Sequence, residues 1–289
     1  MLRRIVLWLM GAGVAALVLA GTAQLAREWS AVQGDDLESL VPTSAQLAVA
    51  WDTHRADILG VYLPNTLRVT LIGLAIAITL GLVLATLMDF FPPLRWTLYP
   101  VLIVSQTVPT FAIAVILILL FGFGDGPKII VVVLFCFFAV TTNTLDGLRG
   151  VDQTYVDLVR TMGASPLAIW WKVRLPAALP NFFGGVRLAT TYSVVGAVIG
   201  EYVGSGEGMG KFLQRSYRSF QTDQVFLAVA IIAGLSVLLV ALVTLTEMLT
   251  LRWRYIGQTT RITRFIQFFT QTDAQQTRRV PSQTKEVIS

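Results

Sequence analysis

Long apolar runs constrain this chain more than any other feature of its sequence. Six stretches are long and apolar enough to cross roughly 30 Å of hydrocarbon. They cover residues 5–26, 66–88, 98–121, 128–145, 184–203 and 225–251. A bilayer offers the backbone no hydrogen-bond partners, so such runs cross it as α-helices. We therefore predict an all-α, polytopic membrane protein with about six transmembrane helices.

The composition agrees with a chain that lies largely in lipid and carries no catalytic chemistry. Charged residues make up 13% of the chain and the mean hydropathy is +0.69, whereas soluble domains carry about 25% charged residues. The single cysteine, Cys136, lies in an apolar run and excludes a disulfide within the chain. The single histidine, His54, has no cysteine near it in sequence. We therefore expect no metal site, no cofactor bound by this chain and no enzymatic activity.

The first apolar run resembles a signal peptide, because Arg3 and Arg4 precede it. Its apolar stretch of about 22 residues exceeds the roughly 7–15 residues of a signal-peptide core. We therefore expect residues 5–26 to remain in the protein as a transmembrane span.

Basic residues indicate how the spans are oriented. With the N-terminus inside, the inner segments and adjoining helix ends carry 15 of the 22 lysines and arginines, and the outer side carries 7. An excess of basic residues marks cytoplasmic segments. We therefore expect both termini in the cytoplasm, and we attribute the net charge of +5 to topology rather than to nucleic-acid binding.

The segments between the spans differ in length and chemistry. Residues 27–65 form an acidic outer loop, and residues 122–127 form a tight Gly/Pro turn. Residues 204–224 begin with a glycine cluster that lacks the spacing of a phosphate-binding loop. For this stretch we expect a flexible re-entrant loop, with a plain turn as the alternative. The longest inner segment, residues 146–183, is too long for a simple turn.

The inner segment reads DLVRTMGASPLAIWWKVRLP over residues 157–176. Residues 152–162 contain neither proline nor glycine, and their apolar spacing predicts a short helix. Gly163 suits the left-handed position that commonly ends a helix. The sequence therefore predicts a helix followed by a sharp change of direction.

A second short helix is predicted directly after this glycine. Ser165 is a typical N-cap residue, and Pro166 suits the first helical position. We expect the helix to stop at Leu175, because a residue before proline disfavours the helical region. One side of it carries Leu167, Trp170, Trp171 and Arg174. Tryptophan and arginine anchor protein interfaces, and tryptophan also favours lipid headgroups, so the residues alone leave both roles open.

The spacing of this segment resembles the cytoplasmic signature of binding-protein-dependent ABC importer permeases. That signature is Glu-Ala-Ala, three residues, Gly, nine residues and Ile-x-Leu-Pro. Here Asp157 stands where the glutamate belongs, Gly163 matches, and residues 173–176 complete the pattern. Leu158-Val159 replace the two alanines and Val173 replaces isoleucine. These departures keep the sign of the charge or the apolar character.

The resemblance covers about residues 60–254. Residues 105–152 resemble the two central spans of the subfamily that serves nitrate, sulfonate, taurine, thiamine-pyrimidine precursors and riboflavin. Residues 182–226 resemble its fifth span and following outer loop. Within them, GEYVGSGEGMG is closer to the pyrimidine-precursor and riboflavin branch than to the sulfonate branch.

The resemblance implies a type I ABC importer permease, a multi-pass protein of the bacterial inner membrane. It would form a homodimer, bind two ATPase subunits that carry ATP and Mg, and receive a small organic solute from an external binding protein, which the glycine-rich outer loop would contact. Residues 1–65 would form the first span and outer loop, residues 66–254 the permease core with its coupling segment at about 146–183, and residues 255–289 a partly disordered cytoplasmic tail. The implied ATPase-coupling residues are Asp157, Met162, Gly163, Ala164, Ser165, Pro166, Leu167, Trp170, Trp171, Leu175 and Pro176.

Polar residues inside the spans are candidates for the substrate pathway, because each is costly in lipid. The candidates are Gln106, Thr107, Pro109, Asn143, Tyr192, Ser193 and Glu201. Pro109 should kink its helix and free a carbonyl group. Thr107 and Ser193 suit helix–helix contacts, whereas Glu201 and Asn143 suit a functional role.

The tail carries one amphipathic stretch. Ile262, Phe265, Ile266 and Phe269 fall at helical spacing, with Arg261 and Arg264 beside them, which suits a helix on the inner membrane surface or on the ATPase. The residues from Thr270 onward are rich in Gln and Thr, and we expect them to be disordered.

Two other classes of function stay open. A secondary transporter would usually carry charged groups in the middle of its spans for ion coupling, and these spans lack them. A membrane scaffold without transport activity is the second alternative.

Overall fold

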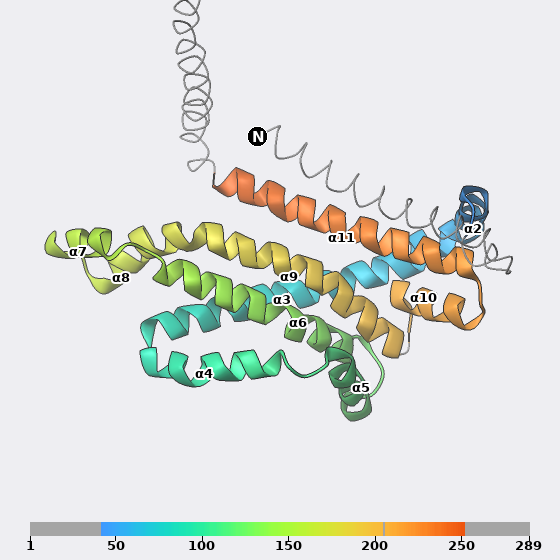
Figure 1. Cartoon of the computed structure of the whole chain (residues 1–289), viewed down its shortest axis with the longest axis horizontal. Helices are drawn as coiled ribbons and strands as arrows, with labels where there is room; N and C mark the ends of the chain where they lie inside the picture. The colour runs from blue at the N-terminus through green and yellow to red at the C-terminus, as the bar shows by residue number, and fades with distance from the viewer. Residues whose placement is uncertain (1–41, 205, 252–289) are drawn as a thin grey trace, which may run out of the picture. The chain divides into compact units, whose positions relative to one another are not determined.

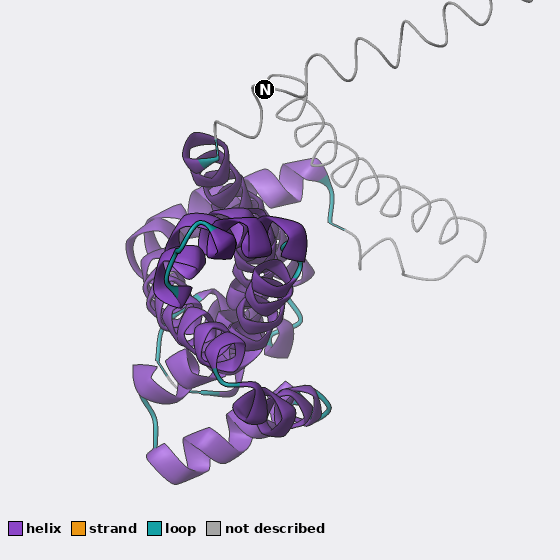
Figure 2. Cartoon of the chain, turned by 90° about the vertical axis from the view of Figure 1, so that its left-hand side faces the viewer, coloured by secondary structure: helices purple, strands orange, loops and turns teal. Residues whose placement is uncertain are grey.

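The computed structural model of the chain describes residues 42–204 and 206–251. The span expected at 5–26 and the tail expected at 255–289 lie outside these residues. Every regular element in the described part is helical (Figures 1 and 2). The α-helices are α2 (Ser44–Asp57), α3 (Leu63–Phe90), α4 (Pro92–Ser105), α5 (Thr110–Phe121), α6 (Asp125–Arg149), α7 (Gln153–Thr161), α8 (Pro166–Ile169), α9 (Leu175–Val203), α10 (Met209–Arg218) and α11 (Thr222–Thr250), with two π-helical turns, η2 (Ile58–Tyr62) and η3 (Trp170–Arg174).

Four helical stretches in the described part are long and apolar enough to cross a membrane. They cover Ser44–Phe90, Asp125–Arg149, Pro166–Val203 and Thr222–Thr250, and the pair α4 and α5 adds a fifth if it counts as one span. The all-α, polytopic prediction is therefore confirmed. The chain divides into two compact units after Thr244, and every site discussed below lies in the first.

The prediction of a loop at residues 27–65 is wrong for residues 44–65, which are helical. Pro64 has no N–H and would normally interrupt a helix. The turn η2 accommodates it, because the Leu63 amide donates a hydrogen bond to the Ile58 carbonyl, five residues back. One helical stretch therefore runs over Ser44–Phe90.

The predicted stop at Leu175 is wrong for the same physical reason. The Leu175 amide donates to the Trp170 carbonyl, again five residues back. This π-helical turn lets the chain pass Pro176, which occupies the first turn of α9. The elements α8, η3 and α9 consequently form one helical stretch over Pro166–Val203.

The span predicted at residues 98–121 is divided into α4 and α5, which are bent by 94°. The break covers residues 106–109, and Pro109 at its end has an extended ψ of 117°. Proline favours such a break because it lacks a donor and restricts the residue before it. The predicted effect of Pro109 is confirmed, although the result is a sharp bend and not one kinked helix.

The glycine-rich loop predicted at residues 204–224 contains a helix instead, α10. Met209 and Phe212 are buried on its inner side. They pack in one cluster with Ile58 and Leu227. Apolar burial therefore orders a segment whose glycine content had indicated flexibility.

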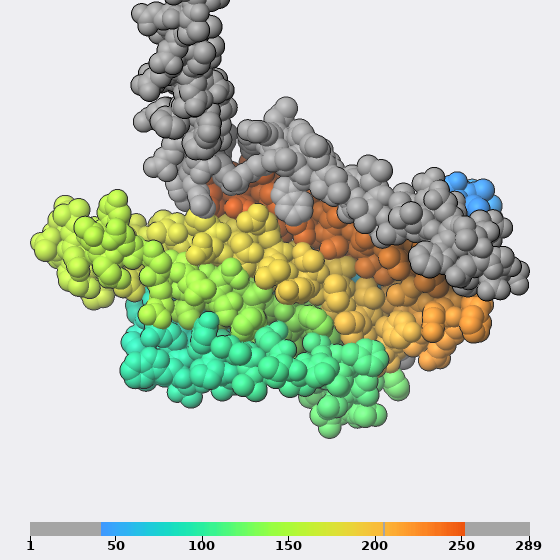
Figure 3. Space-filling view, in the orientation of Figure 1, coloured from blue at the N-terminus to red at the C-terminus, as the bar shows by residue number. Residues whose placement is uncertain are grey.

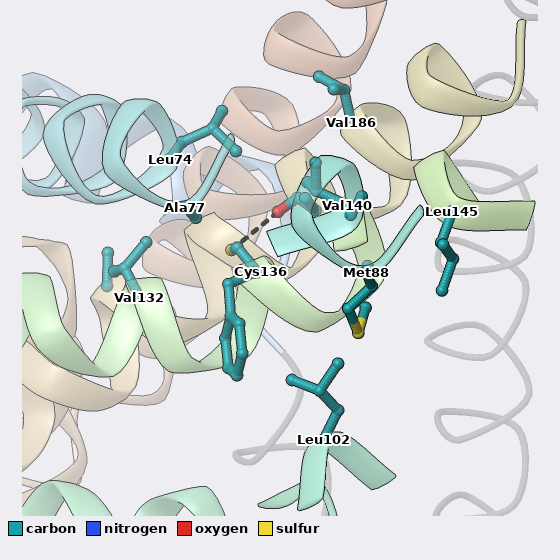
Figure 4. Packing of buried hydrophobic residues seen from close by; sticks show 14 of the residues in the cluster. Leu74, Ala77, Met88, Leu102, Val132, Cys136, Val140, Leu145 and Val186 are labelled. Carbon is teal, nitrogen blue, oxygen red and sulfur yellow. Dashed lines mark hydrogen bonds between the residues drawn. The ribbon is translucent and has the colours of Figure 1, made fainter. Parts of the chain in front are cut away.

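Glycines let α3 approach α6 closely. A Cβ atom on Gly73 would lie 2.6 Å from Val132, and one on Gly81 would lie 2.7 Å from Val140. Small residues of this kind permit the van der Waals packing that holds helices together in membranes. The same core contains Cys136, whose thiol donates to a backbone carbonyl of α9 at 3.1 Å (Figure 4). The helices α3, α6 and α9 thus form the packed centre of the first unit.

Candidate functional site

The segment between α6 and α9 changes direction at a glycine, and we call it the Gly163 elbow (residues 152–176). At its start the Asp152 carboxylate accepts a hydrogen bond from the Thr154 amide at 2.9 Å. This bond lowers the pKa of Asp152 below its usual value. Gly163 follows α7 with a φ of +86°, in the left-handed region that glycine enters without strain. The predicted conformation of Gly163 is confirmed.

The second half of the turn is also built from local contacts. The Gly163 amide donates to the Arg160 carbonyl, and the Ala164 amide donates to the Val159 carbonyl, which completes the end of α7. The Ser165 hydroxyl then accepts from the Ala168 amide at 3.3 Å. Pro166 is the first residue of α8. The predicted cap and proline position are confirmed, and together they fix the angle between α7 and α8.

The Gly163 elbow lies beyond the ends of α6 and α9 (Figures 1 and 3), and it exposes large apolar side chains. They are Tyr155, Leu158, Met162, Leu167 and Trp171. Met162 is 79% exposed. Beside them, Asp157 forms an exposed ion pair with Arg160 at 2.9 Å. An apolar patch bordered by charges is typical of a surface that contacts a partner.

The two tryptophans of the elbow differ in exposure, although their rings are in contact, with centroids 5.0 Å apart. Trp170 is 8% exposed, and its ring centroid lies 5.6 Å from that of Phe90. Trp171 is 59% exposed. Of the two rings, that of Trp171 is therefore the one open to a partner.

The end of the elbow is anchored to the spans. Arg174 lies 3.2 Å from the buried carboxylate of Asp89, and Leu175 packs against a cluster that includes Leu148 and Ala178. The Arg174–Asp89 ion pair could not be predicted, because the two residues are 85 positions apart in the sequence. The elbow therefore exposes side chains from Tyr155 to Trp171 and is fixed at its end by Arg174 and Leu175.

Three of the predicted pathway residues lie together at the break between α4 and α5. Gln106, Thr107 and Pro109 are all exposed there. The Thr107 hydroxyl donates to the Val104 carbonyl at 2.8 Å, so it satisfies the end of its own helix. The break between α4 and α5 thus exposes the polar side chains of Gln106 and Thr107.

Three further candidates lie separately on α6 and α9. The Asn143 side chain donates to the Ala139 carbonyl at 2.8 Å. The Ser193 hydroxyl is buried and donates to the Thr190 carbonyl at 2.7 Å. Tyr192 is partly exposed. Asn143 and Ser193 therefore bond within their own helices, and of these three only Tyr192 has a substantially exposed side chain.

Glu201 joins three helices, an arrangement that we call the Glu201 contact. Its Oε2 atom accepts hydrogen bonds from the Thr66 hydroxyl and from the Gly210 amide, both at 2.9 Å. The Met209 amide donates to the same hydroxyl at 2.8 Å. Residue 201 is 1% exposed. The carboxylate therefore links α3 and α9 to the start of α10, with Thr66 as a partner that sequence reasoning missed.

Two positions next to this contact, 208 and 210, have no room for a side chain and must be glycine. A Cβ atom on Gly208 would overlap the Glu201 carboxylate, and one on Gly210 would overlap the Val198 carbonyl oxygen. The spacing of small residues in GEYVGSGEGMG was a usable signal for such close packing. It indicates contact between backbones rather than flexibility.

The single histidine and the single cysteine each make a hydrogen bond within the protein. The ring nitrogen Nε2 of His54 lies 2.8 Å from the side-chain amide of Gln224, and the Cys136 thiol donates to a carbonyl group. Within residues 42–204 and 206–251, no group of three His, Cys, Asp or Glu residues could hold a metal ion.

Known proteins resemble this chain over most of its length. Residues 77–255 match the family described as binding-protein-dependent transport system inner membrane component. A formylaminopyrimidine transport permease of Halalkalibacterium halodurans is 36% identical over 74% of this chain and 86% of that protein. A putative aliphatic sulfonates transport permease of Bacillus subtilis is 35% identical over 63% and 66%. A riboflavin transport permease of Chloroflexus aurantiacus is 34% identical over 55% and 61%.

The family match covers the Gly163 elbow, the α4–α5 break and Glu201, and it agrees with the apolar helices of the described part. The matches favour an importer component over a secondary transporter or a scaffold. The chain belongs to the family of binding-protein-dependent transport system inner membrane components, as a multi-pass permease of an ABC importer in the inner membrane.

Proposed function

We propose that the Gly163 elbow docks onto a partner ATPase and transmits its movement to the substrate pathway. The observation that carries this proposal is the continuity of the helical stretch Pro166–Val203. Because α8 continues without interruption into a membrane-crossing helix, a displacement of α8 also moves α9. The exposed apolar side chains around Met162 supply a surface that large side chains of a partner can cover.

In this proposal two copies of the chain form the pathway, and each binds one ATPase subunit that carries ATP and Mg. An external binding protein delivers the cargo. Closure of the ATPase pair on ATP binding draws the two elbows together. This shifts the equilibrium from an inward-open to an outward-open state, because ATP binds one state in preference. The chain itself hydrolyses nothing.

The pathway in this proposal runs past the α4–α5 break and the exposed side of α9. Gln106, Thr107 and Tyr192 support it, because their polar side chains are exposed. Pro109 contributes by ending the hydrogen-bonding pattern of the span. Asn143 on α6 and Ser193 and Glu201 on α9 would hold the helices beside this path in place through their hydrogen bonds.

For the cargo we favour a thiamine-pyrimidine precursor or riboflavin over a sulfonate, taurine or nitrate. The formylaminopyrimidine permease supports this, since its similarity covers more of the chain than that of the sulfonate permease. Binding of formylaminopyrimidine, riboflavin and an alkanesulfonate to the cognate binding protein, measured by calorimetry, tests the proposal. Sulfonate binding without binding of the two heterocycles would overturn it.

Reconstituted uptake tests the function as a whole. The chain with its ATPase in proteoliposomes should accumulate cargo only when ATP and the loaded binding protein are both supplied. Uptake driven by a proton gradient alone would indicate a secondary transporter. Absence of uptake with a fully assembled, ATP-hydrolysing complex would indicate a scaffold.

A pair of tyrosines tests the docking surface. Tyr155 on α7 and Tyr217 on α10 are 63% and 64% exposed, and they lie on different helices at the two ends of α9 (Figure 1). Tyr155→Asp should weaken co-purification of the ATPase and lower cargo-stimulated ATP hydrolysis, because it puts a charge into the apolar surface. Tyr217→Asp should leave ATPase binding unchanged. Equal behaviour of the two variants would contradict docking at the elbow.

A further inference from the structure

An open cavity of about 350 Å³ lies between α4 and α6. Arg95, Trp96 and Tyr99 line it from α4, and Asp146 and Arg149 line it from α6. The start of α4 and the end of α6 lie at the same end of the spans as the Gly163 elbow (Figure 1). The cavity shares no residue with the elbow, the α4–α5 break or the Glu201 contact. Its charged and aromatic lining is typical of the level at which lipid headgroups meet water.

The charges of α6 in this cavity are not paired with each other, unlike similar charges elsewhere. Three other acidic residues form an ion pair with a base three positions later in the same helix. They are Asp52 with Arg55, Asp125 with Lys128 and Asp157 with Arg160, at distances of 2.9–3.5 Å. Asp146 and Arg149 have the same order and spacing, yet neither forms an ion pair or a side-chain hydrogen bond with any residue that the structure describes. Both side chains are therefore available to a ligand in the cavity.

Arg95 adds a second cation to the cavity from the facing helix. Its side chain is partly buried and forms no ion pair within residues 42–204 and 206–251. The two guanidinium groups and the single carboxylate of Asp146 give the lining a net charge of +1. Guanidinium groups match the geometry of phosphate oxygens, and a carboxylate can only accept hydrogen bonds. The fitting ligand is therefore a phosphate with one negative charge that also carries hydrogen-bond donors.

We propose that this cavity binds the head group of phosphatidylglycerol. Arg95 and Arg149 donate to its phosphate oxygens, and the glycerol hydroxyls donate to the Asp146 carboxylate. Basic pockets between transmembrane helices bind anionic head groups at the cytoplasmic side, and the basic residues of the chain favour that side for the elbow end. Trp96 is 70% exposed, as expected for a ring at the level of the head groups.

The surface beside the cavity suits the rest of a lipid better than a second copy of the chain. Ile103 lies one turn further along α4 than Tyr99 and is 47% exposed, so apolar surface continues from the cavity toward the middle of the span. A symmetric contact between two copies through this cavity would bring Arg95 and Arg149 against the same two cations. Like charges at such a contact are unfavourable.

The position of this lipid connects α4 to the start of the Gly163 elbow. Arg149 is the last residue of α6, and Asp152, which caps α7, follows three positions later. A head group held by Arg95 and Arg149 therefore restrains the end of α6 against α4. The lipid fixes the point from which the elbow departs.

Lipid binding to the complete complex tests the site. The permease with its ATPase is delipidated in detergent and titrated with single lipids, and native mass spectrometry measures the affinity of the tightest bound lipid. Phosphatidylmethanol carries the same charge as phosphatidylglycerol but lacks the glycerol hydroxyls. Phosphatidylglycerol should bind about fivefold more tightly than phosphatidylmethanol, the effect of one hydrogen bond.

The arginines are tested by a matched pair of double variants. Arg95→Gln with Arg149→Gln should weaken phosphatidylglycerol binding about thirtyfold, or about fivefold for each arginine. Arg215→Gln with Arg218→Gln removes the same charge from exposed positions of α10, at the other end of α9, and should leave the tightest site unchanged.

The carboxylate is tested by a change of opposite sign. Asp146→Ala removes the acceptor of the glycerol hydroxyls together with a negative charge beside the phosphate. It should abolish the preference for phosphatidylglycerol and strengthen the binding of phosphatidylmethanol. Loss of the fold would weaken the binding of both lipids, so the two causes are distinguishable.

Three results would overturn the proposal. The first is an unchanged affinity for phosphatidylglycerol in the Arg95 and Arg149 double variant. The second is displacement of the lipid by an equal concentration of glycerophosphoglycerol, because the cavity would then bind a soluble phosphodiester. The third is efficient disulfide formation between Trp96→Cys residues of two copies in a membrane, because a second copy would then cover the cavity.

Discussion

Gly163 and Gly210 are both required as glycine, for opposite physical reasons. Gly163 has a φ of +86°, and a Cβ atom there would meet nothing within 4 Å. Gly210 has no unusual φ, but a Cβ atom there would overlap the Val198 carbonyl oxygen. The elbow thus needs the conformational freedom of glycine, whereas the Glu201 contact needs its small size.

The two glycines mark an exposed surface that is open to a partner, at the elbow, and a packed contact between helices, at Glu201. The Gly163 elbow sets an angle and leaves apolar side chains such as Met162 exposed. At the other end of α9, Met209 and Gly210 are buried. There the Glu201 carboxylate accepts a hydrogen bond from the Gly210 amide at the start of α10. Substitutions at the elbow should therefore alter coupling, and substitutions at the Glu201 contact should alter the stability of the fold.

The largest effect is expected for Gly210→Val. The new side chain would strike the Val198 carbonyl group and the Glu201 side chain, and neither backbone can move without displacing α10. We expect a loss of about 3 kcal/mol of stability, seen as a lower midpoint in thermal size-exclusion assays. The control is Gly234→Ala, because a Cβ atom there meets nothing within 4 Å. A midpoint equal to that of the wild type in Gly210→Val would remove the contrast with Gly163.

Removal of the acceptor in the Glu201 contact should have the next largest effect. Glu201→Leu leaves the Gly210 amide without its acceptor, which costs about 2 kcal/mol, whereas the Thr66 hydroxyl can still donate to the Tyr62 carbonyl. Glu201→Gln keeps an acceptor oxygen and should lose less than half as much in the same thermal assay. If Glu201 instead contacts cargo, both variants should impair uptake while the thermal midpoint stays unchanged.

A smaller effect on stability is expected for Gly163→Ala. An alanine at a φ of +86° costs about 1–2 kcal/mol, and the cost falls on the turn rather than on the packed core, because the added Cβ meets no atom. The thermal midpoint should fall less than in Glu201→Leu, while cargo-stimulated ATP hydrolysis should fall. Gly163→Asn should retain more activity, since asparagine tolerates the left-handed region. A large loss of thermal stability in Gly163→Ala would show that the elbow is part of the core.

The sequence allowed the elbow to be predicted where short-range chemistry decides its shape. Gly163 and the Ser165-Pro166 pair act on atoms within four residues, so residue type alone indicates their conformation. The stop predicted at Leu175 failed because a π-helical turn carries the chain past Pro176, as another does before Pro64. Such turns depend on how the helix is packed, and no residue type marks them.

The polar contacts between helices could not be predicted in the same way. Glu201 was recognised as costly in a span, but its partner Thr66 is 135 residues away. Asp89 and Arg174 are similarly remote from each other in sequence. Pairing of this kind follows from helix packing, which the glycines of α3 make possible by close approach to α6 and which the apolar runs alone do not specify.

The smallest effect is expected at the cap of α8. Ser165→Ala removes the acceptor of the Ala168 amide and should cost about 1 kcal/mol. Since α8 has only one turn, the loss should appear as faster hydrogen exchange at Ala168, with no change at the Gly210 amide in the Glu201 contact. Ser165→Asn retains a capping oxygen and should restore slow exchange. Equal acceleration at both amides would mean that the two ends of α9 are one cooperative unit, and the contrast between an adaptable elbow and a filled contact would then fail.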